Sequence, residues 1–235
     1  MSGLFAFPDR AAVNRLLPKT RLTEFLRQAG TGGRAPVRLR ERLAAQVQDI
    51  VWAYKLAPET INLPAGSGAE EIQVFRVLLK GAELDHDLLR AVDRAVSFPV
   101  WFELHHARGE GADNGLIQPI AAPKRPHATD TARQVLGDYL TGAPQAASTT
   151  RAPLPPALNL GALHTAMLQS LIPLAPRPGE DLRSQLERLN ELRGKQRELD
   201  RLEARLRREA QFNRKVALNR QVRALREALQ ALGAD

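Results

Sequence analysis

The spacing of hydrophobic residues changes near residue 180 of this 235-residue chain. Before that point, short apolar runs alternate with breaks that contain all 16 prolines. Beyond it, leucines recur in steps of three and four, first as Leu182, Leu186 and Leu189. Such steps are typical of a helix that packs along one apolar seam. The pattern therefore predicts a globular domain over residues 1–172 and a helical arm over residues 180–235.

The arm contains two leucine series that are out of phase with each other. The second series starts at Leu218 and continues with Val222 and Leu225, and the break falls at residues 211–213. Two antiparallel helices that turn near Asn213 account for this break. The alternative is one continuous helix with a stutter, which would dimerise with a second chain. We predict the hairpin.

The globular domain carries the patterns of both strands and helices. Runs rich in β-branched and aromatic residues predict strands at residues 49–56, 71–79, 99–104, 115–121 and 134–140. Apolar residues at helical spacing predict helices at residues 21–29, 37–48, 85–97 and 158–171. The run 99–104 is nearly all apolar, which favours a central strand covered on both faces. We therefore predict an α/β (α+β) fold with a mixed sheet flanked by helices, and a loop or linker over 142–156.

Positive charge is concentrated in the arm, close to the break between the two leucine series. The whole chain has a net charge of +8, and residues 205–226 hold eight bases against one acid, Glu209. The eight bases are Arg205, Arg207, Arg208, Arg214, Lys215, Arg220, Arg223 and Arg226. A stripe of this kind attracts phosphate backbones or an acidic protein face. We predict that these residues bind nucleic acid or a partner; the alternative is a solvated helix face.

Composition excludes several classes of protein. The chain has no cysteine, which excludes disulfides, thiol catalysis and cysteine-ligated zinc. No apolar run approaches the roughly 18–20 residues that cross a bilayer. The first ten residues also do not have a basic segment followed by a long apolar stretch, as a secretory signal would. We expect a cytoplasmic protein with no resident metal or other cofactor.

Polar residues interrupt the otherwise apolar predicted strands at Lys55, Glu71, Gln73 and Glu103. Glu71 and Gln73 project to the same face because side chains alternate along a strand. Many metal-dependent nucleases hold a divalent cation with carboxylates and a lysine on such strands. Here Asp49 or Glu59 would be the second acidic ligand, Lys55 is the nearby lysine, and Gln73 stands where the pattern expects lysine. This predicts a Mg²⁺ site only if the chain is a nuclease; surface polar residues are the alternative.

Five phrases of the sequence together carry a family resemblance. They are Leu17–Lys19, Trp52–Leu63, Glu71–Phe75, Val92–Val96 and Gln211–Val216. They resemble a family of bacterial domains of unknown activity, encoded beside helicases and DNA methyltransferases in defence or restriction-type loci. The resemblance extends over nearly the whole chain. It points to Lys19 and Lys55 as positions to test, without assigning them a role.

These observations lead to one expected function and two alternatives. The expected function is an accessory, non-catalytic subunit of a DNA-modification or phage-defence assembly. Its basic arm would dock on a helicase or DNA methyltransferase subunit, on DNA, or on both. The first alternative is a divalent-metal nuclease. The second is a structural module whose arm forms a homodimer.

Overall fold

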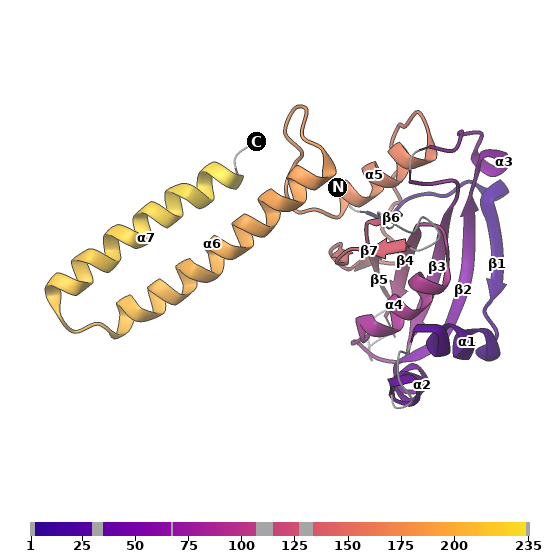
Figure 1. Cartoon of the computed structure of the whole chain (residues 1–235), viewed down its shortest axis with the longest axis horizontal. Coiled ribbons are helices and arrows are strands. Elements are labelled where there is room, and N and C mark those ends of the chain that lie inside the picture. Colours follow the sequence, from indigo (N-terminus) through magenta and orange to yellow (C-terminus); the bar gives the residue numbers. More distant parts are fainter. Residues whose placement is uncertain (1–2, 30–34, 67, 107–114, 127–133, 234–235) are drawn as a thin grey trace. The chain divides into compact units, whose positions relative to one another are not determined.

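The computed structural model describes residues 3–29, 35–66, 68–106, 115–126 and 134–233. The chain divides into two compact units, Met1–Leu171 and Ile172–Asp235. The first unit is a mixed sheet with helices, and the second is a pair of helices (Figure 1). The predicted fold class is confirmed. No helix in the described part of the chain is long and apolar enough to cross a membrane.

The sheet of the first unit has the strand order β1-β2-β3-β4-β5-β8, with β9 also paired to β5. Its strands are β1 (Ala12–Leu16), β2 (Val47–Leu56), β3 (Ile72–Leu79), β4 (Val100–His105), β5 (Leu116–Ala121), β8 (Leu140–Thr141) and β9 (Gln145–Ala146). Strands β3 and β4 are parallel, and the other pairs are antiparallel. Two further short strands, β6 (Lys124–Pro126) and β7 (Gln134–Leu136), pair only with each other. The parallel pair requires a crossover, which α4 supplies.

The helices of the first unit are α1 (Lys19–Ala29), α2 (Ala35–Gln46), α3 (Pro58–Ile61), α4 (His86–Ala95) and α5 (Leu160–Ser170), with a 3₁₀ turn at Asp9–Ala11. Asp85 caps α4, because its carboxylate accepts a hydrogen bond from the Asp87 amide at 2.9 Å. This agrees with the predicted position of Asp85 at the start of that helix. The cap satisfies an amide that the helix itself cannot pair.

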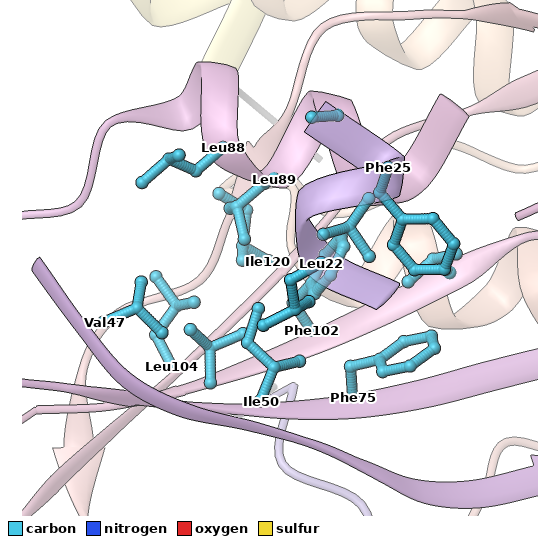
Figure 2. Packing of buried hydrophobic residues seen from close by; sticks show 14 of the residues in the cluster. Leu22, Phe25, Val47, Ile50, Phe75, Leu88, Leu89, Phe102, Leu104 and Ile120 are labelled. Carbon is cyan, nitrogen blue, oxygen red and sulfur yellow. The ribbon is translucent and has the colours of Figure 1, made fainter. Parts of the chain in front are cut away.

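One face of the sheet packs under α1 and α4. Leu22 and Phe25 from α1 and Leu89 from α4 meet Ile50 of β2 and Phe102 of β4 in a single buried cluster (Figure 2). All five side chains are less than a tenth exposed. Burial of a large apolar side chain contributes about 1.5–3 kcal/mol relative to leaving it exposed. This cluster therefore fixes the central strands beneath the two helices.

The opposite face of β4 presents Trp101, Glu103 and His105, because alternate residues point to opposite sides. The N-terminal segment covers part of this face. The ring of Phe5 lies 5.6 Å from that of Trp101. Phe5 also pairs with Ala152 as an isolated parallel bridge, and the Ala6 amide donates to the Ala152 carbonyl at 2.7 Å. These contacts hold the segment around residue 151 above the sheet.

Four of the five predicted strands correspond to β2, β3, β4 and β5, and β4 is central and buried as expected. Strand β1 was not predicted because its residues are mostly exposed, with Asn14 at a φ of 47°. The helix predicted over 37–48 ends at Gln46, where pairing of Val47 with Leu79 begins β2. The single strand predicted over 134–140 was wrong, since β7 and β8 divide it. Part of the predicted loop at 142–156 forms β9.

The second unit is a hairpin of α6 (Leu182–Arg208) and α7 (Phe212–Gly233). Arg226 Nη2 of α7 lies 2.7 Å from Glu203 Oε1 of α6, near the turn. At the other end, Arg188 Nη1 donates to the Leu232 carbonyl at 3.0 Å. These two pairs make the helices antiparallel, so the predicted hairpin is confirmed and the single continuous helix is wrong. The turn itself lies at residues 209–211 rather than near Asn213, which is inside α7.

Candidate functional site

The structure brings four of the predicted nuclease residues together at one end of β2 and β3. Lys55 Nζ lies 2.7 Å from Glu59 Oε1 and 3.3 Å from Glu71 Oε2. Gln73 Nε2 donates to Glu71 Oε1 at 2.7 Å. The contact with Glu59 raises the pKa of Lys55, and the same contact lowers the pKa of Glu59. The lysine ammonium therefore lies between two carboxylates, in the position that a cation ligated by both would take.

Asp49, the other predicted ligand, is separated from this group. It pairs with Leu78 in the β2–β3 ladder, whereas Lys55 pairs with Gln73. Six residues of strand correspond to about 20 Å. Within the described residues, no group of three histidine, aspartate or glutamate side chains is arranged to hold a metal ion. Lys19, the other family position, begins α1, and its side chain lies outside the described part of the structure.

All eight predicted basic residues of the arm are exposed. They lie on the end of α6 and on α7, around the turn at 209–211. Among the described residues, Arg226 is the one member of the set with an ion-pair partner, Glu203. Phe212 and Val216 at the start of α7 are also exposed, at 76% and 38%. We call this surface, the eight bases with Phe212 and Val216, the hairpin tip.

The other half of the hairpin has a different charge arrangement. Arg183 pairs with Glu187 at 3.0 Å, and Lys195 Nζ lies 3.4 Å from Glu191. Arg188 is buried and pairs with Glu180 at 2.8 Å. Because acids neutralise bases here, the positive potential of the arm is concentrated at the hairpin tip.

A second cluster of charged side chains surrounds Glu103, whose side chain is 0% exposed. Arg151 Nη1 and Nη2 donate to Glu103 Oε1 and Oε2 at 2.5 and 2.9 Å, which is the bidentate geometry of a strong arginine–carboxylate pair. Arg151 Nη1 also donates to the Phe5 carbonyl at 2.9 Å. The hydrogen bond to Glu103 raises the pKa of Arg151. This pair ties the 151 region and the N-terminal segment to the central strand.

Two further groups approach the same carboxylate from β3 and β4. Arg76 Nε lies 3.8 Å and His105 Nε2 3.7 Å from Glu103 Oε2. Arg76 Nη2 donates to the Tyr54 hydroxyl at 2.8 Å, and its guanidinium lies 5.2 Å from the centre of the Tyr54 ring. Burial raises the pKa of Glu103, but the contacts with His105, Arg151 and Arg76 outweigh burial and hold it below its usual range. We call Tyr54, Arg76, Glu103, His105 and Arg151 the sheet-face cluster.

Some residues of the sheet-face cluster could be recognised from the sequence. Glu103 stood out as an acid inside an apolar strand, and such an acid requires a buried partner. Arg76 could have been found because it alternates with apolar residues on β3, opposite Phe75 and Val77. Arg151 could not, because it comes from the predicted loop at 142–156. Its position depends on the non-local bridge between Phe5 and Ala152.

A third charged group is buried beneath α4. Lys124 Nζ lies 2.7 Å from Asp93 Oδ1, and Asp93 Oδ2 accepts from the Tyr139 hydroxyl at 3.2 Å. Burial raises the pKa of Asp93 and lowers the pKa of Lys124. The Nζ group also donates to three backbone carbonyls, and those contacts favour the charged ammonium. This fully enclosed arrangement is suited to holding α4 in place rather than to binding a ligand.

Comparison with known proteins gives one match. The sequence model of a family described as a domain of unknown function, DUF4391, matches residues 5–229. No curated protein and no solved structure matches the chain. The matched range includes the sheet-face cluster and the whole hairpin tip.

Proposed function

The chain belongs to the DUF4391 family, and we propose that its hairpin tip binds the phosphate backbone of DNA. In this proposal the protein is an accessory, non-catalytic subunit of a bacterial DNA-modification or phage-defence assembly. The observation that carries the proposal is the contrast between the two halves of the hairpin. Residues 205–226 hold eight exposed bases against one acid, whereas residues 181–203 hold six bases and six acids, so that positive charge is not in excess there. Exposed bases of this kind neutralise phosphates and release counterions.

The spacing of the bases suits a long, regular anion. On α7 they extend from Arg214 to Arg226, a length of about 18 Å at 1.5 Å per residue. Double-stranded DNA presents about ten phosphates over that length. Exposed arginines at several positions along the helix can therefore each find a phosphate without a unique register. Binding of this type is independent of sequence and falls steeply with salt.

The protein partner in this proposal is a helicase or DNA methyltransferase subunit. This part of the proposal rests on the family resemblance of the sequence. The hairpin tip would act together with that partner on DNA. Co-purification of the tagged full-length chain with candidate subunits from the same gene neighbourhood tests it. If neither class of enzyme is recovered, the result contradicts the assembly that we propose but not DNA binding by the hairpin tip.

The DNA-binding proposal is tested by fluorescence anisotropy with a labelled duplex over a series of salt concentrations. The test variant replaces Arg208, Arg220 and Arg223 by alanine. These residues are exposed and have no ion-pair partner among the described residues. If each contacts one phosphate, the slope of log K against log salt falls by about 2.7. Absence of binding by the wild-type chain at low salt would exclude the proposal.

The matched control removes three exposed arginines from the other half of the hairpin, Arg183, Arg193 and Arg197. Both variants lose three positive charges from the same unit, so the change in net charge is equal. We expect the control to retain most of the wild-type salt slope. An equal loss in both variants would mean that total charge, rather than the hairpin tip, determines binding. Circular dichroism at 222 nm checks that both hairpins remain helical.

A purely structural role remains the alternative in which the arm forms a homodimer. The exposed Phe212 and Val216 are the apolar residues of the tip that such a dimer could bury. Light scattering of the full-length chain and of a Phe212→Ser, Val216→Ser variant separates the two roles. A wild-type dimer that this variant converts to a monomer, in a protein that does not bind DNA, would favour the structural role.

A further inference from the structure

We propose that the sheet-face cluster binds a phosphate group, with Arg76 as its principal ligand and Tyr54 and His105 as flanking donors. This site lies in the first unit, on the face of the sheet opposite α1 and α4. It does not depend on the hairpin tip.

The sheet-face cluster has more positive than negative side chains. One carboxylate, that of Glu103, faces the guanidinium groups of Arg76 and Arg151 and the ring of His105. The cluster therefore carries a net positive charge of one with a neutral imidazole, and two with a protonated one. The three basic side chains are 29%, 27% and 30% exposed, whereas the carboxylate is fully buried. The exposed part of the cluster therefore belongs to the basic side chains and not to the acid.

The cluster also has hydrogen-bond donors without acceptors. Arg151 uses both of its terminal nitrogens on Glu103. Arg76 uses Nη2 on Tyr54, but its Nε is 3.8 Å from Glu103, beyond hydrogen-bond distance. In the described structure, neither Arg76 Nε nor His105 Nε2 has a hydrogen-bond acceptor. A buried donor that lacks an acceptor is unfavourable, so an oxyanion that shifts Arg76 and pairs its nitrogens would be stabilised.

The arrangement of the remaining donors suits a tetrahedral ligand better than a planar one. A planar carboxylate matches the two parallel N–H groups of one guanidinium, as in the Glu103–Arg151 pair. The remaining donors come from three neighbouring strands, Tyr54 from β2, Arg76 from β3 and His105 from β4. Adjacent strands are about 4.8 Å apart, so these donors approach from different directions. A tetrahedral phosphate can accept from several directions at once, and arginine is the side chain that pairs with it most readily.

The chain offers a matched control for Arg76 in Arg90. Both side chains are 29% exposed. Arg90 lies 5.6 Å from the Tyr139 ring centre and 3.5 Å from Asp138, close to the 5.2 and 3.8 Å of Arg76 to Tyr54 and Glu103. Arg90 differs in that its acid is fully exposed, so its surroundings are those of an ordinary surface pair. Loss of either arginine removes the same charge and a similar stacking contact.

Isothermal titration of the full-length protein with inorganic phosphate is the direct test. We expect wild-type and Arg90→Ala proteins to bind phosphate with similar affinity and Arg76→Ala to bind at least about tenfold more weakly. If Arg76→Ala fails to fold, Tyr54→Phe provides the second test. It keeps the ring, removes only the hydroxyl that holds Arg76, and should weaken binding about two- to tenfold. No phosphate binding by the wild type, or equal losses in Arg76→Ala and Arg90→Ala, overturns the proposal.

The source of the phosphate is distinguished by competition. The competitors are a 5′-phosphorylated oligonucleotide and the same oligonucleotide without the phosphate. Each is added to phosphate-bound protein in which Arg208, Arg220 and Arg223 are replaced by alanine. These substitutions weaken the hairpin tip, so that displacement reports on the sheet-face cluster. Displacement by the phosphorylated form alone assigns the site to nucleic-acid ends, and displacement by neither assigns it to small phosphorylated molecules. Equal displacement by both overturns the assignment to a terminal or free phosphate.

Discussion

Lys124 Nζ lies 2.7 Å from Asp93 Oδ1, although the two side chains are only 2% and 1% exposed. The same ammonium donates to the backbone carbonyls of Asp93, Val96 and Phe98 at 2.6, 2.7 and 2.8 Å. These carbonyls lie at and just beyond the end of α4, where a helix leaves its last carbonyls unpaired. A cation at this end also interacts favourably with the helix dipole. Lys124 therefore acts as a buried cap that joins α4 to β6.

Replacement of Lys124 by methionine is predicted to destabilise the first unit strongly. The substitution keeps the aliphatic stem but leaves the Asp93 carboxylate buried without its cation. Removing one partner of a buried ion pair costs about 3–5 kcal/mol. Urea denaturation followed by tryptophan fluorescence measures the change. A Lys124→Met, Asp93→Asn double variant should recover part of the loss, and a single variant as stable as wild type would contradict the capping role.

A second prediction concerns His164 on α5. Burial lowers the pKa of His164 to about 4, from a usual value of 6.5. In the unfolded chain this histidine takes up a proton near pH 6.5, while in the folded protein it stays neutral until about pH 4. Protonation of His164 in the unfolded chain therefore lowers the free energy of unfolding as the pH falls from 6.5 to 4. Above pH 6.5 the histidine is neutral in both states, and this loss is absent. The full effect is about 3 kcal/mol, at 1.36 kcal/mol for each pKa unit.

Denaturation of wild type and His164→Leu at pH 7 and pH 4.5 measures this effect. Leucine has no proton to take up, so the variant should lose less stability than the wild type over this interval. The comparison uses the pH dependence of each protein, and a packing change that acts equally at both pH values cancels. Parallel losses in the two proteins would show that His164 is not the group responsible.

Glu103→Gln is expected to change stability and ligand binding in opposite directions. Glutamine removes the charge that Arg151 pairs with, and hydrogen bonds to charged groups contribute about 1.5–3 kcal/mol each. The first unit should therefore unfold at lower urea concentration. Phosphate should bind more tightly, because the acid that competes for Arg76 and Arg151 is neutral. A destabilised variant with unchanged phosphate affinity would mean that the carboxylate and the ligand do not share these arginines.

The pH dependence of the wild type follows from the same carboxylate. Contacts with His105, Arg151 and Arg76 outweigh burial and hold the pKa of Glu103 below its usual 4.5. Because its pKa is lower in the folded state, the ionised Glu103 contributes to the free energy of unfolding. This contribution is complete above pH 4.5 and is lost as the pH falls through the folded-state pKa. The Glu103→Gln variant should lack this component of acid unfolding. Urea midpoints measured between pH 5 and pH 3 test it.

The fold class could be predicted because hydrophobic periodicity reports local structure directly. Runs rich in β-branched and aromatic residues identified β2, β3, β4 and β5, and steps of three and four identified the two helices of the arm. Periodicity failed where pairing determines the strand. β1 has mostly exposed residues and exists because it pairs with β2. The helix over 37–48 was extended too far for the same reason, since Val47 belongs to the β2–β3 ladder.

The candidate sites were predictable to different degrees. The hairpin tip depends on charges close together in sequence on a regular helix, so the composition of residues 205–226 located it. The sheet-face cluster depends on three neighbouring strands and a loop that meet only after folding. Glu103 pointed to it, but the pairing of Glu103 with Arg151, 48 residues away, required the tertiary structure. Lys124 and Asp93, 31 residues apart, gave no signal because each is an ordinary surface residue in sequence.

The last prediction concerns how the two ends of the hairpin are joined. Arg188 is 7% exposed and donates to both oxygens of Glu180, to the Ala175 carbonyl and to the Leu232 carbonyl. It thus connects the segment before α6 to the last turn of α7. The hydrogen bond from Arg188 lowers the pKa of Glu180 to about 2. The contribution of this pair to stability is present above pH 4.5 and is lost as the pH falls from 4.5 to about 2.

Hydrogen exchange of the full-length protein provides the measurement. In Arg188→Met, amides in the last turns of α7 should exchange faster than in wild type, while amides near Leu218 at the other end should change little. Met is chosen because it keeps the aliphatic volume and removes the five donors. Arg183→Met is the control, since Arg183 is exposed and pairs only with Glu187 among the described residues. Uniformly faster exchange along both helices in Arg188→Met would mean that the residue supports the whole hairpin rather than joining its ends.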